Sequence, residues 1–145
     1  MIKELIKDKE LLKQRSTYAT KADLSVVQDL IDTAESLGLT YLSAPQIGVF
    51  KKIAIIYINI WKRWQVIVNP LRIKGTQSFR WKIDECPNCG KVKMRVPEKS
   101  VYVVMQDENM RATKRMFYHK YGCWYFHIEN HFRGNCIGGE ENGFK

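Results

Sequence analysis

Hydrophobic positions along the chain follow two kinds of spacing, one helical and one strand-like. Between residues 23 and 37 the apolar positions recur three and four residues apart, which is the spacing of one face of an α-helix. Thr20 or Asp23 can cap the start of this helix, and Gly38 suits its end. The same kind of spacing predicts a second helix over about residues 120–133, which Gly134 would end.

Shorter apolar runs rich in β-branched residues lie between the two helices and predict antiparallel strands. These runs cover residues 53–58, 63–68, 101–106 and 113–118. Asn69 and Pro70 are expected to break the second strand, because proline cannot donate to a sheet ladder. A short extended piece is expected at 40–44 before a turn at 45–48. Residues 71–83 are expected to be irregular or strand-like.

The order of helix, strands and helix indicates an α+β fold with antiparallel or mixed sheets. We expect a single domain over residues 1–145, since this length allows one sizeable core. Residues 1–22 fit either a helix or an irregular segment that wraps around the sheet. The Gly- and Glu-rich tail, residues 137–145, is expected to be loose.

Composition excludes several classes of protein. A hydrophobic share of 45% and an aromatic share of 12% argue against a disordered chain. No apolar run approaches the roughly 20 residues of a membrane helix, and the first residues lack the apolar stretch of a secretory signal. We therefore expect a soluble protein of the cytoplasm with no membrane partner. The four cysteines are expected to be thiols or metal ligands rather than disulfides.

The positive charge is concentrated in the middle of the chain. Residues 51–95 hold eleven Lys and Arg against two acidic residues, and this excess equals the net charge of +9 of the whole chain. Such a surface either serves solubility or contacts an anionic partner, such as the ribosome and its RNA. No RNA-binding sequence motif accompanies the charge. The residues expected to carry such a contact are Lys51, Lys52, Lys62, Arg63, Lys91, Lys93 and Arg95.

Two groups of residues have the spacing of metal ligands. His127 and His131 lie four residues apart on the second helix, so both imidazoles face the same side. Cys86 and Cys89 form a Cys-x-x-Cys turn with Pro87 and a following glycine, as in a zinc knuckle. Zinc takes about four nitrogen and sulfur ligands, and these four residues would supply them. Without a metal, the two pairs would be ordinary buried or surface histidines and buried thiols.

Several segments, in the same order along the chain, resemble the peptide deformylase family. The family's GxGLAAPQIG segment has a counterpart in LTYLSAPQIG at residues 39–48, and its EGCLS segment in DECPN at residues 84–88. Its helix with His-Glu-x-x-His has a counterpart in FHIENHFRG at residues 126–134. The short C-terminus is similar to compact versions carried by bacteriophages, so the expected compartment is the cytoplasm of a bacterium or of a phage-infected host.

The resemblance implies a fold and a reaction. It implies sheets packed around a central helix that carries the metal site. Cys86, His127 and His131 would hold one divalent ion, with Zn(II) expected here and Fe(II) or Ni(II) as alternatives. Gln46 would stabilise the oxyanion. In the family, a glutamate after the first histidine accepts a proton from the metal-bound water, which then attacks the formyl group of an N-terminal formylmethionine.

This chain departs from the family at the positions that perform the reaction. Ile128 occupies the general-base position and cannot accept a proton, while Glu129 lies about 100° further around the helix. Pro87 has no N–H to offer an oxyanion. Tyr41 places bulk where the backbone of a peptide substrate would lie. If Cys89 supplied a fourth ligand, the site would be closed to water; otherwise three ligands would leave it open, with Cys89 as a packed thiol.

The sequence is therefore compatible with three functions. The first is a deformylase-like metal-binding protein that has lost, or nearly lost, catalysis and serves as a binding or scaffold module. The second is an active, metal-dependent deformylase that acts on nascent formyl-peptides, with Asp84 or Glu85 as a replacement base. The third is an unrelated zinc-knuckle module that binds nucleic acid, which would leave the APQIG segment at residues 44–48 without a role.

Overall fold

The computed structural model describes residues 1–73 and 78–136, and the predicted loose tail lies outside these residues. The helices are α1 (Lys9–Leu12), α2 (Val26–Leu37) and α3 (Lys120–Arg133), with 3-10 turns at Lys21–Ser25 and Ala44–Ile47. The strands are β1 (Tyr41–Ser43), β2 (Ile53–Ile58), β3 (Arg63–Ile73), β4 (Phe79–Cys86), β5 (Gly90–Pro97), β6 (Ser100–Gln106) and β7 (Ala112–Tyr118).

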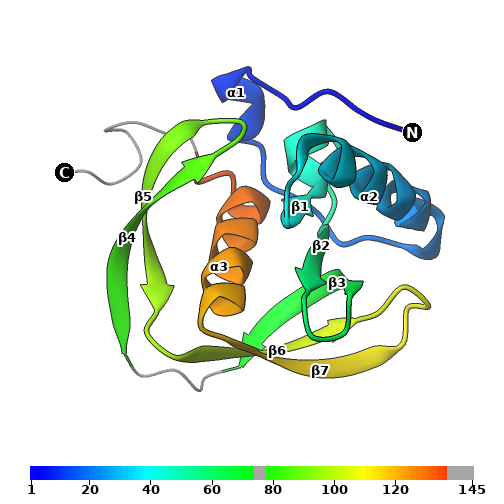
Figure 1. Ribbon diagram of the computed structural model, residues 1–145. Coiled ribbons are helices and arrows are strands. Elements are labelled where there is room, and N and C mark those ends of the chain that lie inside the picture. The colour runs from blue at the N-terminus through cyan, green and yellow to red at the C-terminus, as the bar shows by residue number, and fades with distance from the viewer. Residues whose placement is uncertain (74–77, 137–145) are drawn as a thin grey trace.

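The strands form two antiparallel sheets with α3 between them. Five strands pair in the order β1-β2-β3-β6-β7, and β4 and β5 form a separate hairpin. Figure 1 shows this hairpin curving around α3, with α2 on the other side of β1 and β2. The α+β class with antiparallel sheets is thus confirmed. Within the described ranges, no helix is long and apolar enough to cross a membrane.

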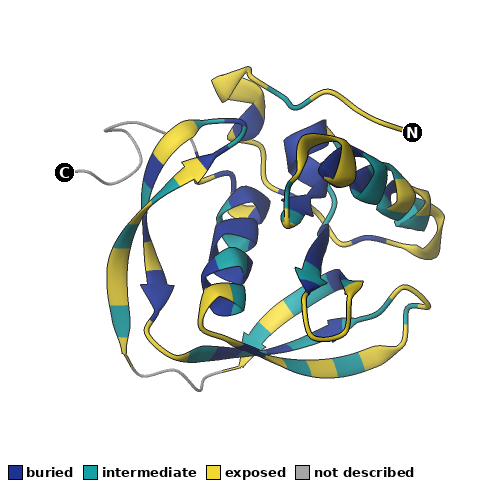
Figure 2. Ribbon diagram, viewed as in Figure 1, coloured by how far each residue is buried: buried dark blue, intermediate teal, exposed yellow. Residues whose placement is uncertain are grey.

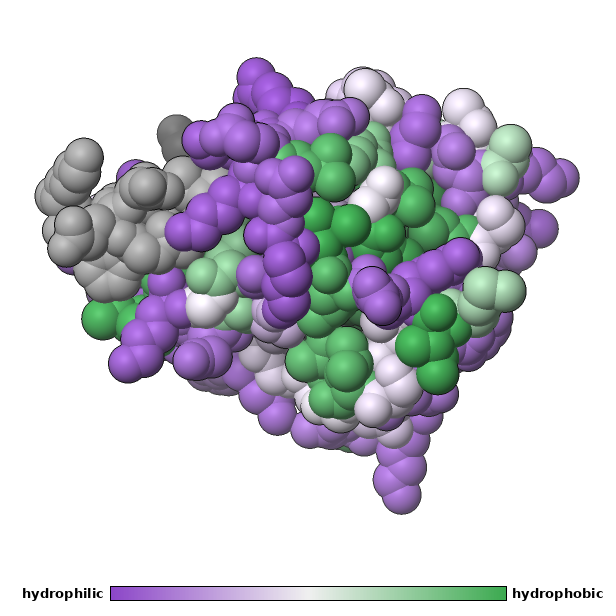
Figure 3. All heavy atoms as spheres, turned by 90° about the horizontal axis from the view of Figure 1, so that it is seen from above, coloured by the Kyte–Doolittle hydropathy of each residue, from purple (hydrophilic) through white to green (hydrophobic). Residues whose placement is uncertain are grey.

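Apolar side chains cover both faces of the five-stranded sheet at β1, β2 and β3. In β2, Ile53 and Ile55 pack in a cluster with α2, whereas Ala54 and Ile56 belong to a second cluster with α3 and the hairpin. Because both faces are buried, β2 is apolar at successive positions rather than alternate ones. Figure 2 shows that α3 is buried along most of its length. In the view from above, hydrophobic residues gather in the middle of the face and hydrophilic ones surround them (Figure 3).

The structure corrects the predicted end of β3. The strand does not break at Asn69 and Pro70 but continues to Ile73, with a bulge between Val68 and Leu71. Asn69 takes a positive φ of 49°, and its side-chain oxygen accepts a hydrogen bond from the Ala19 amide at 2.7 Å. A bulge tolerates proline because the extra residue is left out of the ladder.

Two further elements differ from the prediction. The helix expected from residue 23 begins at Val26 and follows a 3-10 turn, in which Thr20 and Asp23 form the expected capping interaction. The strand β5 was not predicted, and β4 was expected only as an irregular or strand-like stretch. Basic and apolar residues alternate along β5, which is the pattern of a strand with one face in the core, whereas the apolar Trp81 and Ile83 of β4 are exposed.

Gly134 is expected to be the glycine that tolerates substitution least. It ends α3 with a φ of 72°, and a Cβ at this position would overlap the carbonyl oxygen of Lys13. We expect Gly134→Ala to lower the free energy of unfolding by about 2–4 kcal/mol, from the left-handed backbone and the overlap together. Urea denaturation monitored by circular dichroism measures this change.

Gly38 is the matched control for this substitution. It ends α2 with a φ of 68°, but a Cβ there would meet nothing within 4 Å. Gly38→Ala should therefore cost about 1 kcal/mol, from the backbone alone. Equal losses for the two variants would contradict the role given to the contact with Lys13.

Candidate metal centre

Four buried side chains of the type that ligates metals converge at one end of α3. They are Cys86, His127, His131 and Cys136, and their ligand atoms all lie within 4.8 Å of one another. Cys86 is the last residue of β4, the histidines lie one turn apart on α3, and Cys136 follows the helix. Each is at most 2% exposed. The structure therefore brings together the cysteine and the two histidines expected from the sequence, and adds a second cysteine.

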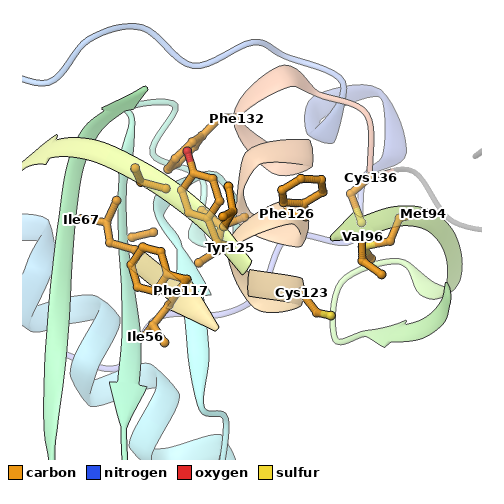
Figure 4. Close-up of a cluster of buried hydrophobic side chains, with 14 of the residues drawn as sticks. Ile56, Ile67, Met94, Val96, Phe117, Cys123, Tyr125, Phe126, Phe132 and Cys136 are labelled. Atoms are coloured by element: carbon orange, nitrogen blue, oxygen red, sulfur yellow. The ribbon is translucent and has the colours of Figure 1, made fainter. Parts of the chain in front are cut away.

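Local backbone geometry explains why these residues meet. The two histidines, four residues apart, stack their rings with centroids 4.9 Å apart. Gly134 then reverses the chain, and the Asn135 amide donates to the Asn130 carbonyl at 2.8 Å. This reversal returns Cys136 to the side of the helix that carries His127. Figure 4 shows Cys136 beside Met94 and Val96, which belong to the hairpin strand β5.

The spacing of these atoms fits a zinc ion. Cys86 Sγ lies 3.3 Å from His131 Nε2, and Cys136 Sγ lies 3.2 Å from His127 Nε2. In a tetrahedral zinc site with ordinary bond lengths, neighbouring sulfur and nitrogen ligands are about 3.6 Å apart. Two sulfurs and two nitrogens are also a common donor set for structural zinc. The four residues thus fit a divalent ion of the zinc type.

His127 has a second partner behind the ring nitrogen that faces away from Cys136. Its Nδ1 lies 2.7 Å from the hydroxyl of Tyr41, which in turn donates to Asp84 Oδ2 at 3.4 Å. With Nδ1 donating to the tyrosine oxygen, Nε2 keeps a free lone pair on the side of Cys136. Burial raises the pKa of Tyr41, so the phenol stays protonated and can complete this chain. A carboxylate behind a ligating histidine is a frequent arrangement in metal sites.

The protonation states of Cys86 and His131 also favour a cation. A hydrogen bond from the Cys136 thiol lowers the pKa of Cys86, and the same contact raises the pKa of Cys136. Burial lowers the pKa of His131, which favours the neutral imidazole that binds metals. Within the described part of the chain, His131 Nδ1 is a buried nitrogen without a hydrogen-bond partner. A buried thiolate next to neutral imidazoles is an environment that a divalent ion would stabilise.

Cys89 lies beside this group but does not belong to it among the described residues. Its thiol donates to the carbonyl oxygen of Cys136 at 2.7 Å. The Cys-x-x-Cys turn is the tip of the β4–β5 hairpin, where Cys86 pairs with Gly90. At this tip the side chain of Cys89 is directed to the backbone of the segment after α3. Cys136, rather than Cys89, is therefore the fourth member of the described cluster.

The positions expected to perform the reaction serve other contacts in this structure. Gln46 is 1% exposed; its oxygen accepts from the Ser43 amide and hydroxyl, and its Nε2 donates to Asn88 Oδ1 at 2.8 Å. Ile128 is fully buried in the apolar cluster around α3. The oxyanion donor is thus engaged with the hairpin tip, and the general-base position is part of the core.

The acidic residues considered as replacement bases do not supply a carboxylate to the group. Asp84 lies 4.0 Å from His127 Nδ1, on the far side of the ring from Cys136. Glu85 is exposed on the hairpin. Glu129 forms ion pairs with Arg72 and Arg133, each at 3.1 Å, which confirms that it points away from the histidines. The described cluster consists of cysteine and histidine alone.

Tyr41 lies directly beside His127, with ring centroids 5.5 Å apart. Its ring stacks on Trp124 of α3, with centroids 5.3 Å apart and planes at 18°. The rings of Trp124 and Tyr121 in turn pack edge to face, with centroids also 5.3 Å apart. This aromatic row occupies space beside His127 and leaves the tyrosine hydroxyl bound to the imidazole.

The seven basic residues expected to bind an anionic partner fall at separate places. Lys51 and Lys52 precede β2, whereas Lys62 and Arg63 lie at its other end, about 20 Å away along the strand. Lys91, Lys93 and Arg95 lie together on β5. The structure thus divides the predicted surface into three parts.

Comparison with known proteins gives a consistent result. A family model described as polypeptide deformylase matches residues 2–138. A peptide deformylase of Clostridium beijerinckii is 29% identical over 139 residues, which cover 94% of this chain and 100% of that protein.

Two solved structures illustrate the similarity of fold. A peptide deformylase from Legionella pneumophila has a TM-score of 0.82 at 20% identity, over 98% of this chain and 89% of the other. A peptide deformylase from Synechococcus elongatus, in complex with actinonin, has a TM-score of 0.80 at 19% identity, over 94% of this chain and 76% of the other.

Proposed function

Because this chain belongs to the peptide deformylase family, we propose that it holds a divalent metal ion, with zinc favoured, and has lost or strongly reduced deformylase activity. On this proposal it works in the cytoplasm as a binding or scaffold module. The observation that carries the proposal is the position of Cys136, whose sulfur lies 3.2 Å from His127 Nε2. A hydrolytic zinc site keeps one position open for water, whereas a site with four protein ligands is structural.

Three further observations support the loss of catalysis. Isoleucine replaces the acidic base and is buried in the core. Proline follows Cys86, so that position has no N–H for an oxyanion, and its carbonyl accepts a hydrogen bond from Lys7 at 2.6 Å. The amide of Gln46 is engaged by Ser43 and Asn88. Each residue that the family uses for chemistry is absent or bound elsewhere, while the metal ligands are retained.

X-ray absorption on the zinc-loaded protein tests the proposal. We expect one zinc per chain with two sulfur and two nitrogen neighbours. In Cys136→Ser the sulfur count should fall to one, whereas Cys123→Ser is the matched control. Cys123 is also buried on or near α3 but lies outside the cluster of ligands. One sulfur and an added oxygen in the unmodified protein would contradict a closed site.

Removing the hydroxyl of Tyr41 should weaken metal binding without removing a ligand. Tyr41→Phe leaves the stacking on Trp124 but takes away the partner of His127 Nδ1. Loss of such an outer contact lowers metal affinity about 10–100-fold. Competition with a chromophoric chelator measures the change. Tyr57→Phe, in β2 against Trp64, is the control and should leave the affinity within about twofold.

A further inference from the structure

A second concave site lies on another face of α3. A hollow of about 830 Å³ is bordered by the hairpin, α3 and the segment after α1, and another of about 790 Å³ extends along β3. The two share Arg72, Phe79 and Phe126, so they form one groove, which we call the α3 groove. On α3 its lining residues are centred about 160° around the helix from the two histidines. The groove is therefore separate from the candidate metal centre.

The α3 groove is strongly basic. Seven Lys and Arg residues line it, and Glu129 is the one acidic residue among its described lining residues. Glu129 is itself held between Arg72 and Arg133 by ion pairs of 3.1 Å. The remaining excess of positive charge lies along a concave surface. Such a surface attracts a polyanion rather than a neutral ligand.

Aromatic rings alternate with these cations. The guanidinium of Arg72 lies 4.5 Å from the ring centre of Phe126, and that of Arg95 lies 4.6 Å from Phe79. The rings of Phe79 and Phe126 are 6.0 Å apart. Trp81, which pairs with Arg95 across the hairpin, is 57% exposed although it is the largest apolar residue of β4. The groove thus presents planar surfaces and positive charges side by side.

We propose that the α3 groove binds single-stranded nucleic acid. Arginine and lysine would contact the phosphates, while Trp81 and Phe79 would stack on bases. Proteins that bind single strands without sequence preference combine these two features, a basic groove and aromatic platforms. An acidic peptide would use the charge but would offer no base to stack on Trp81, whose exposed ring is centred 5.3 Å from Lys93 Nζ. The proposal does not rest on the state of the metal centre, because no ligand of that centre lines the groove.

Fluorescence anisotropy with a labelled 12-nucleotide oligouridine tests the proposal. We expect binding that weakens with salt, and a loss of about tenfold or more in Arg95→Glu. Arg63→Glu is the matched control: it makes the same change of charge, and Arg63 also lies over an aromatic ring, that of Trp61, but outside the groove. It should weaken binding less than about threefold. Trp81→Ala should weaken binding about tenfold, and Trp81→Phe should restore most of it.

Three results would contradict the proposal. Equal losses in Arg95→Glu and Arg63→Glu would mean that net charge alone attracts the strand. Binding of a polyglutamate of equal charge as tightly as oligouridine would identify an acidic protein as the partner. An oligodeoxyuridine of the same length separates RNA from DNA through the 2′-hydroxyl. Circular dichroism and the zinc content show that each variant is folded, and failure of the unmodified protein to bind either strand overturns the inference.

Discussion

Stripping the metal with a strong chelator is expected to lower the melting temperature of this protein by about 10 °C or more. A ligand that binds only the folded chain at 1,000 times its dissociation constant contributes about 4 kcal/mol of stability. For a domain of this size, each kcal/mol corresponds to about 2–4 °C. Removal of the ion would also leave two thiols and two imidazoles packed together without water, each at most 2% exposed. Differential scanning calorimetry with and without chelator measures the shift.

A variant that cannot bind the ion provides the control for this experiment. Cys86→Ala removes the ligand that ties the hairpin to α3, and its thiol lies 3.3 Å from His131 Nε2. Its melting temperature should resemble that of the stripped protein and should not respond to chelator. If the unmodified protein lost its zinc with no change in melting temperature, the cluster would not be a structural site, and the closed arrangement proposed for it would be wrong.

Much of the fold follows from local patterns in the sequence. The strand β2 and the helix α3 were predicted with the bounds that the structure shows, because long apolar periodicity and terminal glycines mark them clearly. The hairpin β4–β5 was harder to predict. Its strand β5 alternates basic and apolar residues, but in β4 the apolar Trp81 and Ile83 lie on the exposed face, opposite Arg95 and Lys93. The pattern of β4 therefore does not show which face of the hairpin is buried.

The candidate metal centre, too, could be predicted only in part from the sequence. The spacing of four residues between His127 and His131, and the likeness of the DECPN segment to the family, were enough to indicate three ligands. Cys136 could not be identified in this way, because no regular spacing in the sequence connects it with the others. The informative feature was Gly134, which was expected to end the helix: a left-handed residue there reverses the chain and returns the next residues toward α3. The direction of that return depends on packing against Lys13.

Catalytic activity is expected to be at least about 10⁴-fold below that of an active deformylase. Loss of a general base costs about 10²–10⁴-fold, and loss of one oxyanion donor costs about 10²–10³-fold. Turnover of a formyl-Met peptide by protein loaded with Fe(II), Ni(II) or Co(II) measures this, with the Clostridium beijerinckii relative assayed alongside. Turnover within tenfold of that relative would contradict the proposed loss and would favour an active enzyme with a replacement base.

Variants that restore the missing base, N–H and open metal position test which of these changes prevents turnover. Ile128→Glu with Pro87→Leu returns the base and the N–H, but the closed ligand set should keep this variant inactive. Adding Cys136→Ser frees a position for water, and only this triple variant is expected to gain measurable turnover. The added carboxylate costs stability, since Ile128 is fully buried, so zinc content and melting temperature must accompany each rate. Activity in the double variant would show that Cys136 does not close the site. If the triple variant is folded and loaded with metal but inactive, the row of Tyr41 and Trp124 would be the remaining obstacle.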